Sequence, residues 1–452
     1  MKIKILLFLL VTVFCTFCSA ASLITVSKSS TAPVIDGKIN DNEWKNAVEI
    51  TGFTRFSDGK YKPSDTVLLM MYDNDNIYIS CKTSWTGNQM YKKLSAKDNE
   101  KMFFNDTVDI SFIVNNTLFV IAGDPMGHEF FRKTTKMSAW APAVTMKSYV
   151  RDSGEIIGGV KSFNRTLWDY EAAIPFKELG MKSPAEGCKI GFAFMRNYAE
   201  TSKLGSGRWT SLHRHTPGKH FGNSNDFGQL VFGGNSPVYK MEQMTELTGG
   251  DVRLKGTVFN PVKNTVKVQP AVEVVIPARN NKVALDKSES LTVGPKAVPF
   301  DVKGKVYLRR SMDLVLTNKI TSNGRTLYEN SYLFTTLPAF HCELIPLFLQ
   351  DKLVITSNVK KISGLSKDFK VIASIKAKKD GKSLKNIKFE HEKDPKYLKS
   401  KVDISAFKPG KHTVSIELID KGKVVAVQNH ELNIPAKPEW FGNKLGISDK
   451  VP

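Results

Sequence analysis

Alternation of apolar and polar residues at a period of two recurs along the chain and is the feature that most restricts its fold. In residues 108–114 apolar side chains stand at every second position, with Asp109 and Ser111 between them. Residues 67–72 and 77–81 form two further runs around the turn cluster Asp-Asn-Asp-Asn at 73–76. Such alternation is typical of strands with one buried face, and paired runs around a polar turn indicate a hairpin. Helical signals are confined to one turn at residues 175–180, so the chain is predicted to be all-β.

Turn-rich segments divide this pattern into three parts. With domains of roughly 150 residues, a chain of 452 residues is expected to hold about three. A Gly-Gly-Asn-Ser-Pro cluster at residues 233–237 marks the first boundary. Short strands are expected behind it at 252–259, 266–268, 272–276, 305–308 and 312–316, and then at 353–356, 369–377, 402–404, 413–419 and 423–427. We predict three consecutive antiparallel β-sandwich domains at residues 21–234, 235–340 and 341–437, followed by a tail at 438–452.

The first twenty residues have the pattern of a secretory signal peptide. Lys2 and Lys4 form a positive region, residues 5–17 are apolar, and residues 18–20 (Cys-Ser-Ala) are suited to cleavage before Ala21. The apolar run is shorter than the ~18 residues of a membrane span, and no later run reaches that length, so no integral membrane segment is expected. Cleavage as a lipoprotein at Cys18 is an alternative that the bulky residues before it disfavour. We predict a secreted, periplasmic or cell-surface protein.

Three cysteines remain behind the signal peptide: Cys81, Cys188 and Cys342. They form no CxxC pair and no Cys/His spacing of a zinc site. Cys81 and Cys188 stand in strand-like runs of the first part and either form one disulfide or remain free buried thiols, which is the state we expect.

The chain carries 65 Lys and Arg against 44 Asp and Glu, a formal net charge of +21. A surplus of this size suggests a nucleic-acid-binding protein. Export argues against a nucleic-acid partner, and the excess lies mainly behind residue 234 without an interleaved aromatic stripe. We interpret the surplus as a solvated basic surface, with attraction to an anionic cell surface or acidic polysaccharide as the alternative.

Several short motifs follow one another through residues 32–232. They are PVIDG at 33–37, NEW at 42–44, YDNDNIYI at 72–79, NDTVDI at 105–110, WDYEAAIPF at 168–176, GFAF at 191–194, Trp209 and FGQL at 227–230. In this order and spacing they resemble a family 9 carbohydrate-binding module. The resemblance implies a two-sheet sandwich that binds a polysaccharide or oligosaccharide and is usually joined to a glycoside hydrolase.

The resemblance also implies a sugar site. Two tryptophans sandwich the sugar in well-known members; here Phe103, with Phe104 beside it, stands at the first position and Phe221 at the second. Asp109 matches an acidic residue of that site, whereas Val120 stands near the place of an arginine. Sugar rings present apolar CH faces and a rim of hydroxyls, so exposed aromatic side chains beside hydrogen-bonding groups suit them. We therefore add three further candidates, Arg196 and Trp209, which flank a Gly/Ser-rich loop, and Trp85, an aromatic residue expected in a loop.

Each candidate has a structural alternative. Phe103 and Phe104 fit a hydrophobic core as well as a platform, and Trp44, Trp168 and Phe192 are expected in the core. Asp106 and Asp109 suit either sugar hydroxyls, a structural calcium ion (assigned to Asp106) or the solvated face of a strand. His213, His215 and His220 share one loop; without a nearby acid or Cys we expect a polar loop rim rather than a metal site.

Residues 438–452 look like the junction that follows an immunoglobulin-like sandwich and leads into a glycoside-hydrolase-like domain, which also suggests that the two rear sandwiches are immunoglobulin-like. Asp106, Asp109, Asp169 and Glu171 are carboxylates of the type that glycosidases use, but such sandwich faces usually bind rather than cut, so we predict no catalytic residues. The preferred function is a secreted carbohydrate-binding protein, accessory to polysaccharide degradation. One alternative is the accessory half of a glycoside hydrolase; another is a haem-binding redox module that uses Met90, Met126 and His128.

Overall fold

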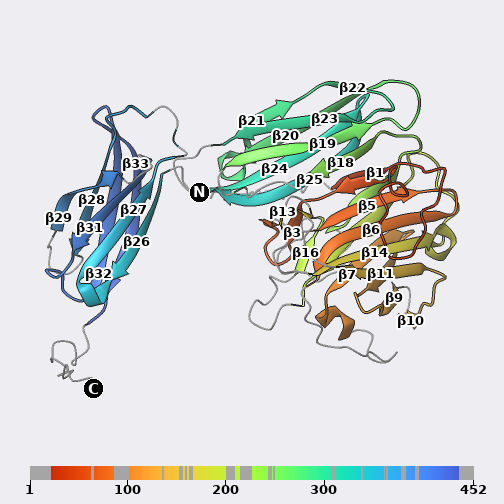
Figure 1. The fold of residues 1–452 in the computed structure, drawn as a ribbon, viewed down its shortest axis with the longest axis horizontal. Helices are drawn as coiled ribbons and strands as arrows, with labels where there is room; N and C mark the ends of the chain where they lie inside the picture. Colours follow the sequence, from red (N-terminus) through yellow and green to blue (C-terminus); the bar gives the residue numbers. More distant parts are fainter. Residues whose placement is uncertain are drawn as a thin grey trace, which may run out of the picture. The chain divides into compact units, whose positions relative to one another are not determined.

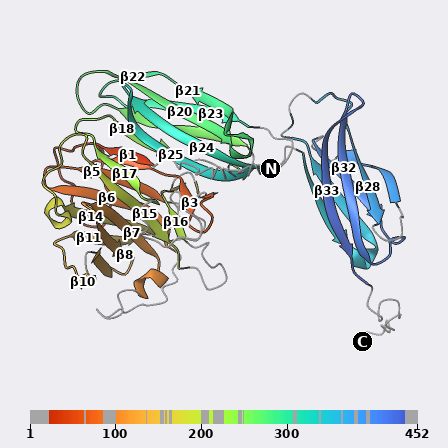
Figure 2. The same ribbon diagram turned by 180° about the vertical axis from the view of Figure 1, so that it is seen from behind.

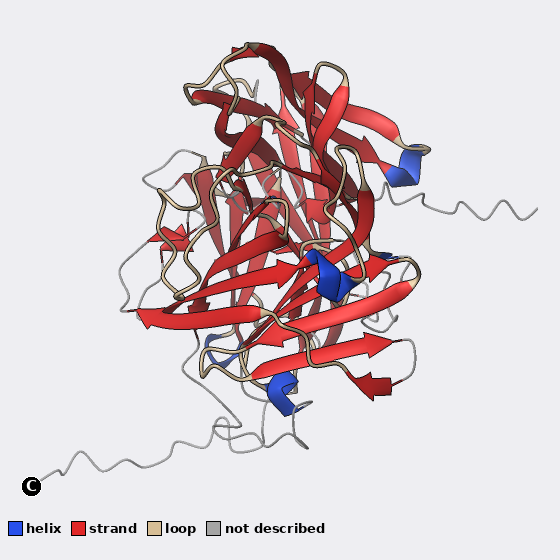
Figure 3. Cartoon of the chain, turned by 90° about the vertical axis from the view of Figure 1, so that its right-hand side faces the viewer, coloured by secondary structure: helices blue, strands red, loops and turns tan. Residues whose placement is uncertain are grey.

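The computed structural model describes residues 22–62, 66–85, 101–134, 137–151, 156–157, 160–161, 166–199, 209–213, 226–242, 247, 250–306, 312–336, 340–360, 362, 365–377, 383–391 and 396–436. Strands make up most of the regular structure in these ranges, which hold no α-helix, and this confirms the all-β prediction (Figure 3). No helix in this part of the chain is long and apolar enough to cross a membrane. The predicted signal peptide and tail, Phe221, Met90, His215 and His220 lie outside the described residues.

The strands up to residue 336 build two large sheets that pack against each other as a sandwich (Figures 1 and 2). Along its main path the first sheet has the order β10 (Met137–Ala139), β9 (Glu129–Thr134), β8 (Thr117–Gly123), β7 (Thr107–Val114), β15 (Lys189–Asn197), β17 (Gly228–Phe232), β1 (Leu23–Val26), β25 (Arg325–Thr336), β24 (Met312–Ser322), β20 (Val266–Ile276), β21 (Lys282–Ser288). Branches of this sheet are β16 (Trp209–Ser211), β3 (Phe53–Arg55), β4 (Tyr61–Lys62) and β22 (Leu291–Val293).

The second sheet has eight strands. Their order is β11 (Thr145–Arg151), β14 (Thr166–Pro175), β6 (Asn76–Trp85), β5 (Val67–Tyr72), β2 (Val48–Ile50), β18 (Val238–Glu242), β19 (Asp251–Phe259), β23 (Val298–Lys305). A separate small ladder joins β12 (Ile156–Ile157) to β13 (Val160–Lys161). The short 3-10 helices are η2 (Phe176–Leu179), η6 (Pro277–Arg279) and η7 (Phe348–Gln350). The first of these is the single turn predicted at residues 175–180, and Gly180 ends it with a φ of 68°.

Both sheets continue from the first predicted domain into the second. In the first sheet β1 pairs in parallel with β17 and antiparallel with β25, so one strand joins elements from either side of residue 234. In the second sheet β18 pairs with β2 on one side and with β19 on the other. Most of residues 22–334 consequently form one compact unit. The sequence pattern predicts the strands of two sandwiches here, but it holds no signal for the sheets that they share.

Strand β20 is longer than the sequence predicts. We expected two strands, 266–268 and 272–276, whereas one strand runs through Pro270, which has no amide hydrogen. Residues 266–268 pair with β22 and residues 271–276 with β21, so the proline lies where these two neighbours meet. Its carbonyl accepts a hydrogen bond from the amide of Glu289 on this side, and the missing amide hydrogen therefore interrupts no ladder. Of the strand predicted at 305–308, Lys305 is the last residue of β23 (Val298–Lys305), and residues 307 and 308 lie outside the described residues.

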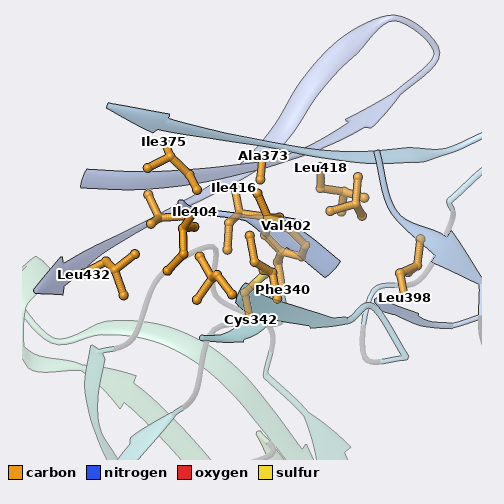
Figure 4. Close-up of a cluster of buried hydrophobic side chains, with 14 of the residues drawn as sticks. Phe340, Cys342, Ala373, Ile375, Leu398, Val402, Ile404, Ile416, Leu418 and Leu432 are labelled. Atoms are coloured by element: carbon orange, nitrogen blue, oxygen red, sulfur yellow. The ribbon is translucent and has the colours of Figure 1, made fainter. Parts of the chain in front are cut away.

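The second compact unit consists mainly of residues from 335 onward and is a sandwich of two four-stranded sheets. One sheet has the order β26 (His341–Leu347), β27 (Lys352–Asn358), β31 (Tyr397–Asp403), β30 (Glu390–His391); the other has β29 (Ser383–Lys388), β28 (Lys370–Ala377), β32 (Gly410–Asp420), β33 (Lys423–Ile434). Side chains from both sheets meet in one core, where Ile375, Ile416 and Val402 lie together with Phe340 (Figure 4). Alternate residues of β28 and β32 are buried, as expected for strands with one solvated face.

The predicted core residues of the first domain are buried. Trp44, Trp168 and Phe192 are fully enclosed. Cys81 and Cys342 are buried, Cys188 is half-buried, and none of the three is in a disulfide. The first domain is therefore held together by packing and hydrogen bonds without a disulfide.

Glu171 is a buried carboxylate that fastens the N-terminal segment to the second sheet. Its Oε1 accepts a hydrogen bond of 2.7 Å from Nε1 of Trp44, and its Oε2 accepts the amide of Gly37 at 2.8 Å. Gly37 has a φ of +89°, and a Cβ there would approach the carbonyl carbon of Ser148 to 2.9 Å. Three motifs of the sequence, at 33–37, 42–44 and 168–176, thus meet at one carboxylate. Burial raises the pKa of Glu171, and the bonds from Trp44 and Gly37 oppose that rise.

Replacing Trp44 with Phe should destabilise the first domain more than replacing Trp168 with Phe. Both indoles are fully buried, but Nε1 of Trp168 has no hydrogen-bond partner in the described part of the chain. Only Trp44→Phe leaves a buried carboxylate oxygen unpaired, which costs about 1–3 kcal/mol beyond the shared loss of volume. Urea unfolding of both variants measures the difference. Equal losses of unfolding free energy would show that the Glu171 bond does not stabilise the domain.

Candidate functional site

A cavity of about 230 Å³ lies on one face of the first sheet, within the first domain. Side chains from five strands and from residues 101–104 enclose it. They are Phe103, Asp109 on β7, Val120 on β8, Phe130 and Arg132 on β9, Met195 and Asn197 on β15, and Trp209 on β16. The cavity thus brings together three of the predicted site residues, Phe103, Asp109 and Trp209.

The register of the strands explains why these side chains share one face. Residues directly opposite each other on neighbouring strands point to the same side of a sheet. The opposite pairs here are Asp109 with Met195, Val120 with Arg132, and Asn197 with Trp209. The β7–β8 hairpin fixes this register through Asn115 and Asn116, whose φ angles of 48° and 61° suit a tight two-residue turn.

The walls of the cavity are aromatic. The rings of Phe103 and Phe130 meet edge to face, with centroids 5.0 Å apart. On the other wall Phe56 supports Trp209 in the same manner at 5.4 Å. Val120 and Phe130 belong to a buried apolar cluster against which Phe103 packs. The two alternatives for Phe103 are therefore not exclusive, because its ring packs on the core and also lines the cavity.

Three polar atoms of the lining are buried without a hydrogen-bond partner in the described part of the chain. They are Oδ1 of Asp109, Oδ1 of Asn197 and Nε of Arg132. Asp109 is only 3% exposed and Asn197 only 2%. Buried polar groups are nearly always bonded, so unbonded ones that border a cavity are suited to a ligand. The set offers two acceptors and one cationic donor.

Asp109 is an acidic lining residue whose pKa is strongly shifted. Burial raises the pKa of its carboxyl to about 7, although the positive charge of Arg196 opposes the rise. Acidic groups with strongly raised pKa values are concentrated at functional sites, because such an arrangement costs stability unless a ligand compensates for it.

Asn197 positions Phe103. Its Nδ2 donates to the carbonyls of Phe103 and Asn105, the latter at 2.9 Å. Asn105 in turn donates to Oδ2 of Asp124 at 3.2 Å, and Asp124 accepts the amides of Met126 and His128, each at 2.9 Å. The segment that carries Phe103 is thereby tied to β15 and to the β8–β9 turn.

Two residues that the sequence suggested as haem ligands, Met126 and His128, lie in this turn. His128 places Nδ1 at 2.8 Å from Oδ2 of Asp124, and Met126 is 48% exposed.

Arg196 lies outside the cavity, although the sequence suggested it as a sugar contact. It points from β15 to the interior between the two sheets and is fully buried. Its Nη2 donates to Oδ1 of Asp106 at 2.6 Å, and its guanidinium stacks on Tyr198 with 4.3 Å to the ring centroid. Asp106, suggested as a calcium ligand, is thus paired with a guanidinium, and no group of three acidic, His or Cys side chains gathers in the described ranges. These residues do not fit a calcium site.

The remaining candidates are dispersed. Phe104 is 45% exposed and is not part of the cavity lining, although it follows Phe103 directly. Trp85 is not in a loop as expected but ends β6 in the second sheet, opposite Thr166. His213 is not on a polar rim as expected: it is 2% exposed and packs edge-on against Phe192. Its ring fills the space beside Gly228, where a Cβ would come within 2.4 Å of it.

Arg132, Asn197, Phe130 and Met195 are lining residues that the sequence reasoning missed. Arg132 lies opposite Val120, and Val120 lies opposite Ser111, which is two residues from Asp109 and on the same face of β7. The sequence therefore carries an arginine in the cavity, one strand away from the position where the family resemblance led us to look for it. Asn197 and Met195 follow from the alternation of β15 once its pairing with β7 is known.

Comparison with known proteins identifies the family of this domain. Residues 35–235 match the model of the family described as carbohydrate family 9 binding domain-like. A family 9 carbohydrate-binding module from Caldicellulosiruptor kristjanssonii, solved with cellotriose, is similar at 18% identity and a TM-score of 0.31 over 47% of this chain and 95% of that one. A module from the same organism solved with glucose gives 17% identity and a TM-score of 0.30 over 47% and 97%. No curated protein matches the chain. The first domain of this chain, as its motifs predict, is a family 9 carbohydrate-binding module.

Proposed function

We propose that the protein is exported and holds a sugar unit in the cavity between Phe103 and Trp209, as an accessory to polysaccharide degradation. One observation carries the proposed site: three buried polar atoms without partners border a cavity with aromatic walls. The family match supports carbohydrate as the ligand class. Asp109 and Asn197 accept hydrogen bonds from sugar hydroxyls in this proposal, and Arg132 donates to an oxygen of the sugar.

Size and chemistry both favour a single sugar ring in the cavity. Its volume of about 230 Å³ lies below the roughly 300–1,000 Å³ of pockets for drug-sized ligands, which suits one ring of a longer chain. The apolar CH face of the ring stacks on Trp209, and the opposite wall offers the Phe103–Phe130 pair. Polar groups lie between these walls, where the hydroxyl rim of a ring held in this way would be.

Export is part of this proposal because the N-terminus has the pattern of a signal peptide. An exported binding module would act on extracellular polysaccharide, and holding the chain beside a hydrolase raises the local concentration of the substrate. In this arrangement the two rear sandwiches act as spacers.

Signal cleavage is directly measurable. Expression in a bacterial host with a general secretory pathway should give a product outside the cytoplasm that begins at Ala21, because residues 18–20 are suited to the peptidase. Intact mass and N-terminal sequencing identify the terminus. An intact chain that begins at Met1 and stays in the cytoplasm would refute export.

Two adjacent phenylalanines offer a matched test of the site. Phe103→Ala removes a wall of the cavity and should weaken polysaccharide binding about tenfold, because a stacked aromatic side chain contributes roughly 1.5 kcal/mol. Phe104→Ala removes an equal volume from an exposed position and should leave binding nearly unchanged. Affinity gel electrophoresis across a panel of soluble polysaccharides measures both.

The proposed site would be wrong if the two phenylalanine variants bound alike. Trp209→Ala serves as a second variant from the opposite wall and should weaken binding at least as much as Phe103→Ala. A thermal unfolding curve of each variant establishes that the domain is folded.

Asp109 should make the first domain less stable as the pH rises. Its pKa in the folded state, about 7, lies above its ordinary value of 3.8, so the folded protein holds the proton more tightly than the unfolded chain does. The stabilisation from the protonated carboxyl is complete below about pH 4 and is lost as the pH rises to about 7, a change of roughly 4 kcal/mol. Asp109→Asn should remove this loss, so that the variant exceeds the natural protein in unfolding free energy at pH 8 but not at pH 4. The prediction would be wrong if the unfolding free energies of the two proteins, measured with urea, changed with pH by the same amount.

A further inference from the structure

The guanidinium of Arg132 is the feature of the cavity that bears most directly on the class of sugar, because a neutral sugar can bond to it without balancing its charge. Arg132 is half-buried on β9, and its Nε is buried at the cavity. It forms no ion pair and no hydrogen bond with any residue that the structure describes. By contrast Arg196, the buried arginine of the same domain, is paired with Asp106 at 2.6 Å. Among the described residues, no acidic side chain therefore supplies a counter-charge for Arg132.

Asp109 is the one acidic residue among the lining residues that the structure describes, and it forms no ion pair with Arg132. Burial raises the pKa of Asp109 to about 7, so in mildly acid solution its carboxyl is largely uncharged and can donate a hydrogen bond. Under these conditions the described lining residues carry a net positive charge.

A partly desolvated cation without a partner favours an anionic ligand. A hydroxyl group of a neutral sugar accepts a hydrogen bond from the guanidinium but leaves its charge without a counter-charge. A carboxylate accepts two parallel bonds from the planar guanidinium edge and also neutralises its charge.

We propose that the cavity selects a sugar unit that carries a carboxylate, a uronic acid residue, and that Arg132 determines this preference. The proposal rests on the proposed function, because it names the class of sugar for the same site. The ring stacks between Phe103 and Trp209, and the carboxylate lies against Nε of Arg132. Cleavage of the signal peptide removes Lys2 and Lys4, and the formal charge of +19 that remains of +21 assists the approach of such a polyanionic polysaccharide through long-range attraction.

Matched pairs of neutral and acidic sugars test the preference. Isothermal titration calorimetry at pH 6 and moderate ionic strength would compare the full-length mature protein with the methyl glycosides of glucose and glucuronic acid, galactose and galacturonic acid, and mannose and mannuronic acid. Within at least one pair the acid should bind roughly 10- to 100-fold more tightly than its neutral counterpart. Arg132→Gln should abolish this difference, whereas Arg132→Lys should retain part of it, because lysine keeps the charge but not the planar fork.

Lys133→Gln is the matched control. Lys133 is the next residue on β9, lies opposite Phe119 and places its ammonium over that ring on the other face of the sheet. The variant loses the same charge as Arg132→Gln, so an effect of net charge alone would weaken both equally. Equal weakening would overturn the role of Arg132.

The outcomes separate this proposal from the proposed function. If a neutral sugar bound as tightly as its acid in every pair, and Arg132→Gln weakened both alike, the site would bind sugar without acid selectivity and the present proposal would fail alone. If no member of any pair bound, and longer neutral and acidic oligosaccharides of the same sugars also failed to bind, the proposed function would fail together with it. A preference for the acid that disappears in Arg132→Gln and persists in Lys133→Gln would support the proposal.

Discussion

The buried ion pair between Arg196 and Asp106 is the constraint on which the rest of the first domain depends. Arg196 lies on β15 of the first sheet, and its guanidinium reaches β6 of the second sheet, where Thr83 and the carbonyl of Ser84 accept bonds at 3.1 and 2.7 Å. A buried guanidinium is costly unless all its donors are bonded, so its position between the sheets is narrowly determined. Because strand side chains alternate, fixing Arg196 toward the interior fixes Met195 and Asn197 toward the cavity. A structural ion pair thus orients the site on the opposite face.

The regular elements could be predicted from the sequence because they depend on local chemistry. The alternation of residues 108–114, the polar turn at 73–76 and the proline-to-glycine turn at 175–180 each report on a few neighbouring residues. The shared sheets could not be predicted in this way, because the pairing of β1 with β25 joins Leu23 to Glu329 and depends on no local pattern. Pro270 shows the converse, since a residue that locally predicts a break is tolerated where two neighbouring strands meet.

The sequence predicted the type of candidate site, which combines aromatic and polar side chains, but only some of the residues that line it. Phe103 and Asp109 could be found by resemblance because they stand in motifs with fixed spacing. Arg196 was misassigned because a single sequence does not say which face of a strand an arginine occupies, and the burial of Asp106 became clear only with its partner. Arg132 was not predicted because its place in the cavity depends on the register of β7, β8 and β9, which spacing along the chain does not reveal. A guanidinium on β9 can reach the same cavity as one on the neighbouring strand β8.

The buried charged groups of the first domain differ in whether their polar atoms are bonded within the protein. Glu171 accepts bonds from Trp44 and Gly37, and Asp106 is bonded to Arg196, so these charges are satisfied within the protein. Asp109 and Arg132 border the cavity, and each keeps a buried atom without a partner in the described part of the chain. Folding alone gives no reason to keep such groups, because an apolar residue of similar volume would be more stable there. Their presence in a cavity with aromatic walls is explained if a ligand supplies the missing partners, which is the basis of the proposal that this ligand carries a negative charge opposite Arg132.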